Sequence, residues 1–307
     1  MRPVDPLQFP SWGKAVLYFT WVSCFSAALV LALMPLDQLP RLDDLLAPLE
    51  HHVRLERAVY SPLAYLTLFT LVVWCEIHLA VRRQQLLSPS LVLDFSWYLT
   101  GMLVQAFFIG VWIVFVNQLY NQYFGFLTVS AVGDWHPASK LLVAILVADF
   151  AKWFSHYLRH KIEFLWVFHA VHHSQENMNV FTVNRNHPVD VLLSRTFNVL
   201  PLMMFQNAGT VILGWLIVET MYSKFYHANV RLNFGPLGWV LVTPQSHRLH
   251  HSNVSQQHDL NFGFTFSIWD RLFGTQYDVI HEFVDTGIED NHYPHEKNHM
   301  HRDPWLL

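Results

Sequence analysis

Cysteine is nearly absent from this sequence, and charged residues are scarce. The 307 residues include only two cysteines, Cys24 and Cys75, and both lie inside apolar stretches. A disulfide framework and a metal site built on thiolates are therefore not expected. Asp, Glu, Lys and Arg make up 14% of the chain, against roughly 25% in soluble domains. The formal net charge of −4 gives no reason to expect nucleic acid as a partner.

Several short motifs are also missing. No Gly-x-Gly-x-x-Gly follows a strand-like segment, and no Cys-x-x-Cys-His haem attachment occurs. The first apolar stretch ends in Met34-Pro35-Leu36-Asp37 without a small-residue cleavage site, so a cleavable signal peptide is not expected.

Apolar residues dominate what is present, at 52% of the chain. A helix needs about 20 predominantly apolar residues to cross a bilayer, and four stretches approach that length, near 15–36, 60–81, 93–117 and 139–158. The sequence predicts an all-α integral membrane bundle with about four transmembrane helices and a histidine-rich helical cap. We expect the membrane-spanning part over 1–138, a catalytic domain over 139–275 and a polar cytoplasmic tail over 276–307.

The basic residues beside these stretches predict an orientation. Excess Lys and Arg mark the cytoplasmic side, and they flank one set of ends: Arg2, Lys14, Arg82, Arg83, Arg159 and Lys161. Loop 118–138 has none, whereas loop 37–59 carries three arginines and is an exception. We therefore expect the N-terminus and the histidine-rich half on the cytoplasmic face. The compact length favours a bacterial inner membrane.

A further apolar region over 190–224 is divided by Asn207-Ala208-Gly209. Each half is short for a full span. Two interpretations stay open: a hairpin of two short helices that enters and leaves the membrane on one side, or two buried helices of a soluble cap.

Three histidine clusters, here called the first, second and third boxes, lie in the second half of the chain. Their spacing of three and four residues places imidazoles on one helical face. Imidazole suits iron, zinc, copper and nickel. Eight such ligands are too many for one structural zinc and suit two ions with open positions. The boxes comprise His156 and His160; His169, His172 and His173; and His247, His250 and His251.

The three boxes and their flanks resemble the membrane-bound fatty acid hydroxylase and sterol desaturase superfamily. Asn186-His187-Pro188 resembles a family element between the second and third boxes, and Thr243-Pro244-Gln245-Ser246 resembles the usual lead-in to the third. Asn261-Phe262-Gly263 and the run 269–275 resemble the C-terminal signature. The resemblance covers roughly residues 145–275.

This resemblance implies a non-haem di-iron centre that uses O2 to hydroxylate a C–H bond of a lipid at the cytoplasmic membrane face. It carries over the eight box histidines as ligands, and it adds His227 as a further ligand just before the third box. A fatty acyl chain, a sterol, or a related isoprenoid or amino-lipid would be the substrate. Since no cofactor motif was found, we expect a separate electron donor, a ferredoxin, a cytochrome or their reductase.

Several other residues are candidates for a supporting role. Asp149, two helical turns before His156, is expected to orient a ligand histidine or to pair with Lys152 or Arg159. His187 and His258 are weaker candidates as ligands or as their partners, and His187 could instead form hydrogen bonds in the loop before Pro188. Asp259 and Asp270 are other candidates for orienting a ligand; the alternative for Asp270 is that it only caps the chain turn at Arg271. Aromatic residues near the first two boxes could line a lipid tunnel or pack at the membrane interface: Trp153, Phe154, Phe164, Trp166 and Phe168.

Three rival functions remain open. A lipid desaturase would use the same site, and product mass separates the two outcomes. A haem-carrying electron-transfer protein is disfavoured because three clustered imidazoles would crowd one porphyrin. A metal transporter is disfavoured because the predicted spans before Asp149 carry few polar residues.

Overall fold

The computed structural model describes residues 62–81, 89–101, 106–130, 132, 135–205, 209–277 and 283–288. Within these ranges the protein is helical, with isolated bridges and no strand. The α-helices are α3 (Pro62–Leu79), α4 (Pro89–Thr100), α5 (Ala106–Leu119), α6 (Pro137–Lys161), α7 (Glu163–His173), α8 (Pro188–Met203), α9 (Gly209–His227), α10 (Pro244–His250) and α11 (Ile268–Phe273). The short helices are η3 (Tyr120–Phe124), η4 (Gly125–Leu127), η6 (Thr182–Asn184), η7 (Gly235–Trp239) and η8 (Ser255–Gln257). The predicted all-α class is confirmed for this part of the chain.

Proline opens five of the α-helices, at Pro62, Pro89, Pro137, Pro188 and Pro244. Proline is favoured in the first turn because its missing N–H has no intrahelical partner there. At α10 the preceding Thr243 adds a capping box, in which its side chain accepts from the Ser246 N–H. The helix that carries the third box is only seven residues long, so this cap fixes where it starts.

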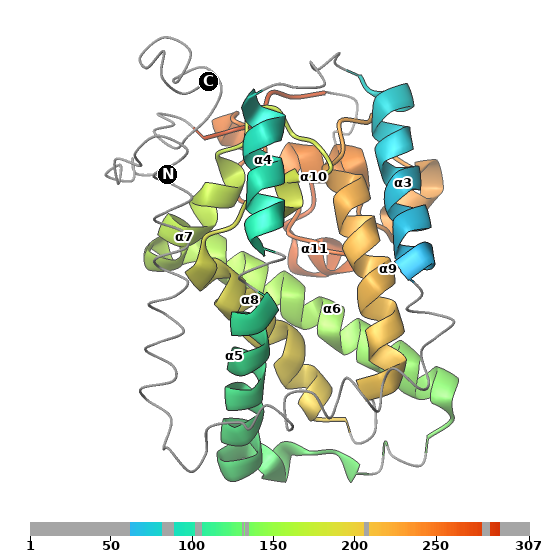
Figure 1. Ribbon diagram of the computed structural model, residues 1–307, viewed down its shortest axis with the longest axis vertical. Coiled ribbons are helices and arrows are strands. Elements are labelled where there is room, and N and C mark those ends of the chain that lie inside the picture. The colour runs from blue at the N-terminus through green and yellow to red at the C-terminus, as the bar shows by residue number, and fades with distance from the viewer. Residues whose placement is uncertain are drawn as a thin grey trace.

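Helix α6 crosses the middle of the molecule and packs against α7, α8 and α9 (Figure 1). In the same view α3 lies beside α9, and α5 lies beside α8. Helices α10 and α11 lie behind α4 and α9. The C-terminal half of α6 therefore lies at the centre of the fold, where α7, α9 and α10 also converge.

One described helix, Ala138–Lys161, is long and apolar enough to cross a membrane. It corresponds to the stretch predicted at 139–158. Within the stretch predicted at 60–81, the apolar part Leu66–Leu79 is shorter, and the stretch at 15–36 lies outside the described residues. The region 190–224 forms two helices, α8 and α9, as expected. The number of spans stays a prediction.

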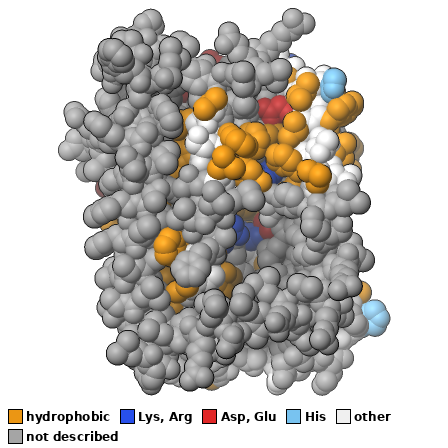
Figure 2. Space-filling view, in the orientation of Figure 1, with side chains coloured by type: hydrophobic (Ala, Val, Ile, Leu, Met, Phe, Trp, Pro, Cys, Tyr) orange, Lys and Arg blue, Asp and Glu red, His pale blue; other side chains and the backbone are white. Residues whose placement is uncertain are grey.

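Hydrophobic side chains are exposed on α3 and α4. On α3 these include Leu71, Trp74 and Ile77, each more than half exposed, and on α4 they include Phe95 and Leu99. Figure 2 shows hydrophobic side chains gathered over the region where these two helices lie. A contiguous apolar surface of this kind is typical of a membrane or protein contact.

A fully buried carboxylate ties α4 to the segment that follows the second box. Asp94 accepts hydrogen bonds from Gln175, from Asn179 Nδ2 (2.9 Å) and from Thr182 Oγ1 (3.1 Å), and it lies 3.5 Å from an Arg185 guanidinium nitrogen. Buried charges are stable only when paired and hydrogen-bonded in this way. The network fixes the loop between α7 and α8, and thereby the end of α7.

Candidate metal centre

The nine histidines predicted as ligands converge in two groups. Within each group, the candidate ligand atoms lie within 4.8 Å of one another, and every member is buried. The first group comprises His156, His160, His169, His173 and His250, and the second comprises His172, His227, His247 and His251.

In the first group, ring nitrogens of different boxes face one another. His156 Nε2 lies 3.0 Å from the Nε2 atoms of both His169 and His250. His160 Nε2 lies 3.2 Å from His173 Nε2. Two nitrogens that each lie about 2.1 Å from a shared ion, at right or tetrahedral angles, are about 3.0 to 3.4 Å apart. The observed spacing is therefore that of ligands around a common ion.

The second group repeats this arrangement around His227. Its Nε2 lies 2.9 Å from His247 Nε2 and 3.3 Å from His172 Nε2, while its Nδ1 is 2.7 Å from the Ser223 carbonyl oxygen. His227 comes from α9, outside the three boxes, and the structure brings it together with three box histidines. The rings of His173 and His251 stack at 4.2 Å and join the two groups.

Helical spacing explains which histidines share a group. Each box places its i and i+4 members together: 156 with 160, 169 with 173, and 247 with 251. The remaining histidine of the second box, His172, and that of the third box, His250, each join the opposite group. A single residue, Ile162, separates α6 from α7, so the chain turns sharply and brings the second box back onto the first.

Backbone carbonyls hold the other nitrogen of two histidines in the first group. His156 Nδ1 lies 2.9 Å from the Phe262 carbonyl oxygen, and His250 Nδ1 lies 2.8 Å from that of Leu260. An Nδ1–H that donates to a carbonyl fixes the tautomer and leaves the Nε2 lone pair free for a metal. The segment 260–262, which overlaps the predicted C-terminal signature at Asn261 and Phe262, thus orients histidines from two boxes.

Asp190 is a functional candidate that the sequence did not reveal. Its carboxylate lies 3.2 Å from His169 Nδ1 and accepts two hydrogen bonds from Arg159, at 3.0 and 3.1 Å. All three side chains are buried. Asp190 was not among the site residues predicted from the sequence. The rule applied to Asp149, that an acid in an apolar helix is a functional candidate, could have found it.

Asp259, one of the predicted orienters, does contact a box histidine. Its carboxylate lies 3.2 Å from His160 Nδ1 and accepts from Lys161 Nζ at 3.0 Å. Burial would raise the pKa of Asp259, but these hydrogen bonds outweigh it and hold that pKa below its ordinary value. The carboxylate therefore stays ionised and can hold the His160 tautomer.

The contacts of Asp149 in the structure differ from those predicted for it. Its carboxylate accepts hydrogen bonds from the backbone N–H groups of residues 265 and 266 (2.9 and 3.2 Å) and from Trp269 Nε1 (2.9 Å). The expected partners, Lys152 and Arg159, form ion pairs with other carboxylates. Asp149 therefore fixes the segment before α11 and orients no ligand histidine in the described structure.

Asp270 holds the turn that carries Phe262 and Gly263, which is not the turn at Arg271 considered for it. Its carboxylate accepts from both backbone N–H groups and from Trp153 Nε1, at 2.8 to 2.9 Å. A Cβ at position 263 would lie 2.7 Å from a Val242 methyl group, so only glycine fits. This turn positions the carbonyl that holds His156.

His187 and His258 belong to neither group. His187 Nδ1 accepts from the Val189 N–H at 3.2 Å and its ring packs on Phe168, so it caps the start of α8. This is close to the loop hydrogen-bonding role considered as its alternative. His258 is half-buried and follows η8.

Burial keeps histidines of the second and third boxes neutral. Loss of solvent, followed by the effect of neighbouring imidazoles, holds the pKa of His247 and His251 well below the ordinary value. Burial also lowers the pKa of His169, His172, His173 and His250. Neutral imidazole is the form that binds metal.

His251 provides a test of whether a metal fits. It is fully buried, and within the described structure neither of its ring nitrogens has a hydrogen-bond partner; the Nδ1 of His247 also lacks one. An unpaired buried polar atom costs about 1–3 kcal/mol. A cation bound by the second group would remove part of that cost, so the residues present fit a metal.

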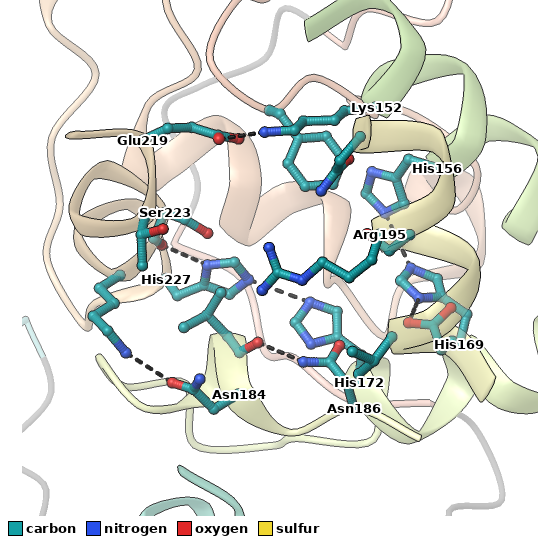
Figure 3. A pocket seen from close by; sticks show the side chains of 18 of the residues that line it. Lys152, His156, His169, His172, Asn184, Asn186, Arg195, Glu219, Ser223 and His227 are labelled. Atoms are coloured by element: carbon teal, nitrogen blue, oxygen red, sulfur yellow. Dashed lines mark hydrogen bonds and ion pairs between the residues drawn. The ribbon is translucent and has the colours of Figure 1, made fainter. Parts of the chain in front are cut away.

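A polar cavity of about 180 Å³ opens beside both groups. Its lining includes His156 and His169 of the first group, and His172, His227 and His247 of the second (Figure 3). None of the five aromatic residues considered for a lipid tunnel lines this cavity: Trp153, Phe154, Phe164, Trp166 and Phe168.

Replacing Asp190 by asparagine should weaken metal binding about 10- to 100-fold, as is typical when a ligand histidine loses its carboxylate partner. The reason is that His169 Nδ1 lies against this carboxylate. Metal affinity would be measured by titrating metal-free protein with Fe(II). Glu163→Gln is the matched control, because it also removes one negative charge but at an exposed residue on α7. Equal Fe(II) affinities for the two variants would show that Asp190 does not support metal binding.

The chain is similar to one protein family and to two proteins named as lipid hydroxylases or monooxygenases. Residues 141–275 match the model of the fatty acid hydroxylase family. The ornithine lipid hydroxylase OlsE of Rhizobium tropici is 33% identical over 142 residues, which are 46% of this chain and 43% of that protein. The alkylglycerol monooxygenase of Homo sapiens is 33% identical over 141 residues, 46% of this chain and 31% of that protein. The chain thus spans less than half the length of these relatives. No solved structure matches it significantly.

Proposed function

We propose that this protein is a membrane-bound, O2-dependent oxidoreductase that hydroxylates a C–H bond of a lipid. The match of residues 141–275 to the fatty acid hydroxylase family supports this proposal. The match confirms the family predicted from the three boxes. The observation that carries the proposal is the convergence of nine buried histidines in two adjacent groups.

Two iron ions are the proposed cofactor, one in each group. His156, His160, His169, His173 and His250 would hold the first, and His172, His227, His247 and His251 the second. When bound, such a pair supplies the oxidising power that an unactivated C–H bond requires, with O2 as co-substrate. The protein's share is to hold the ligands neutral and oriented, through Asp190, Asp259 and the carbonyls of 260–262, and to restrict water at the site.

The relatives favour oxygen insertion over desaturation. Both carry names that describe hydroxylation or monooxygenation, one of an ornithine lipid and one of an alkylglycerol. We therefore propose a polar lipid as the substrate, and electrons from a separate ferredoxin, cytochrome or reductase. Imidazole nitrogens within 4.8 Å of one another leave no room for a porphyrin between them, which disfavours the haem alternative.

The membrane arrangement proposed is the predicted one, with the histidine centre at the cytoplasmic face. Two observations support contact with lipid: the apolar length of Ala138–Lys161 and the exposed hydrophobic side chains of α3 and α4. The cavity lies beside the C-terminal half of α6, close to where this candidate span ends.

Lipid profiling of cells with and without the gene tests this function. We expect one class of lipid to gain the mass of one oxygen when the protein is present, and iron to copurify with it. Loss of two hydrogens would instead establish a desaturase. Unchanged lipids together with protein free of iron would overturn the proposal.

A further inference from the structure

The cavity beside the metal centre carries more positive than negative side chains. Two of its cations are neutralised by ion pairs: Lys152 with Glu219, and Arg159 with Asp190. No further Asp or Glu lines the cavity, whereas two more cations do, Arg195 and Lys224. A cavity with an excess of positive charge attracts an anionic ligand.

Arg195 extends from α8 into this cavity (Figure 3). Its side chain is exposed, and among the described residues it forms no ion pair. Glu219, the carboxylate that could serve it, is bound by Lys152. A guanidinium presents a planar set of donors that matches a carboxylate or a phosphate.

Lys224 reaches the same cavity from α9. It is 1% exposed, its Nζ donates to Asn184 Oδ1 at 2.7 Å, and it lies 4.7 Å from the centre of the Tyr98 ring. An ammonium group has three donors, and a buried one is costly without an opposite charge. Arg195 on α8 and Lys224 on α9 therefore offer two cationic donors to one cavity.

We propose that Arg195 and Lys224 bind the anionic group, a carboxylate or a phosphate, of a polar lipid headgroup, and so hold a C–H bond near that headgroup against the histidines. This proposal rests on the proposed function and narrows its substrate to lipids with an acidic headgroup. The cavity is smaller than the roughly 300–1,000 Å³ of sites for drug-sized ligands. It therefore suits a headgroup and not the whole lipid, and the oxidised carbon should lie in or beside the headgroup.

Binding measurements on iron-loaded, full-length protein in phosphatidylcholine nanodiscs test this. The probes are phosphatidic acid, an N-acyl amino acid and a neutral monoalkylglycerol. Wild-type protein should bind at least one acidic lipid more tightly than the neutral one. Arg195→Gln should weaken binding of that acidic lipid about 10- to 100-fold, which is the loss expected for a hydrogen bond to a charged group. Binding of the neutral lipid should not change. Arg195→Lys should retain part of the affinity.

Arg271→Gln is the matched control, because this arginine stacks on Trp239 and does not line the cavity. Iron content shows whether each variant is folded. If Arg195→Gln fails to fold, the proposal is tested by the lipid affinities of Lys224→Gln and by the preference of the wild type for acidic over neutral lipid.

Equal wild-type affinity for acidic and neutral lipids would overturn the proposal, as would unchanged binding in Arg195→Gln and Lys224→Gln. Competition by inorganic phosphate as strong as by phosphatidic acid would assign the site to a free anion and overturn the headgroup role. Each of these results leaves the proposed function standing if iron and the oxygenated lipid are still found. Failure of the function itself would show as wild-type protein without iron and without product.

Discussion

Alanine in place of His172 or of His250 is expected to abolish lipid hydroxylation and to remove iron. The two residues belong to different groups, and each faces another ligand nitrogen at 3.0–3.3 Å. Since losing an outer partner of a ligand already costs roughly 10–100-fold in activity, losing the ligand itself should cost more. Iron per chain should fall from about two towards one or none. Metal analysis and product analysis measure the two effects.

His78→Ala is the control for these variants. This histidine lies exposed on α3, packs on Trp74 and belongs to neither group. Its replacement should leave iron content and product unchanged. Full turnover in both His172→Ala and His250→Ala would show that the two groups are not the catalytic centre.

Metal-free protein should lose stability steeply in mild acid. Six buried histidines of the second and third boxes have pKa values below the ordinary value of about 6.5. Below that pH the unfolded chain takes up protons that the folded chain does not, so the free energy of unfolding falls as pH falls. Each imidazole contributes up to about 1.4 kcal/mol per pH unit. The six together approach about 8 kcal/mol per unit, enough to unfold a typical domain of 5–15 kcal/mol.

Denaturant unfolding of the chelator-treated protein between pH 7.5 and pH 5 measures this slope. The double variant His247→Asn, His251→Asn removes two of the six groups and should reduce the slope by about a third. Above about pH 7.5, where the histidines are neutral in both the folded and the unfolded chain, they should contribute almost no pH dependence. A free energy of unfolding that stays flat down to pH 5 would mean that these rings are not buried together.

The helical boxes could be predicted because their information is local. Residues three and four apart meet on a helix whatever the rest of the fold does, and the structure indeed places box histidines together in this way. The assignment of His172 and His250 to the opposite groups depends on how α7 and α10 approach each other. That approach is a tertiary property which no spacing within one helix encodes.

The partners of the buried carboxylates likewise could not be predicted from spacing within one helix. Asp149 was predicted to act on its own helix because it lies two turns before His156, yet its partners lie more than a hundred residues away in the chain. Asp190 contacts His169 because α8 packs across α6 and α7. Asp94 was likewise unremarked in the sequence, although its buried hydrogen bonds fix the loop after the second box. Long-range pairing of this kind becomes visible only in the assembled molecule.

The division of neighbouring histidines between the groups has a consequence for how the centre is loaded. His172 and His173 are consecutive, as are His250 and His251, and each pair sends one ring to either group. A small rotation of α7 or α10 would therefore disturb both sets of ligands at once. Capture of a first ion should fix both helices in place, which prepares the second set and makes the half-filled state a minor species. Titration with iron should then proceed from empty to full in one concerted step.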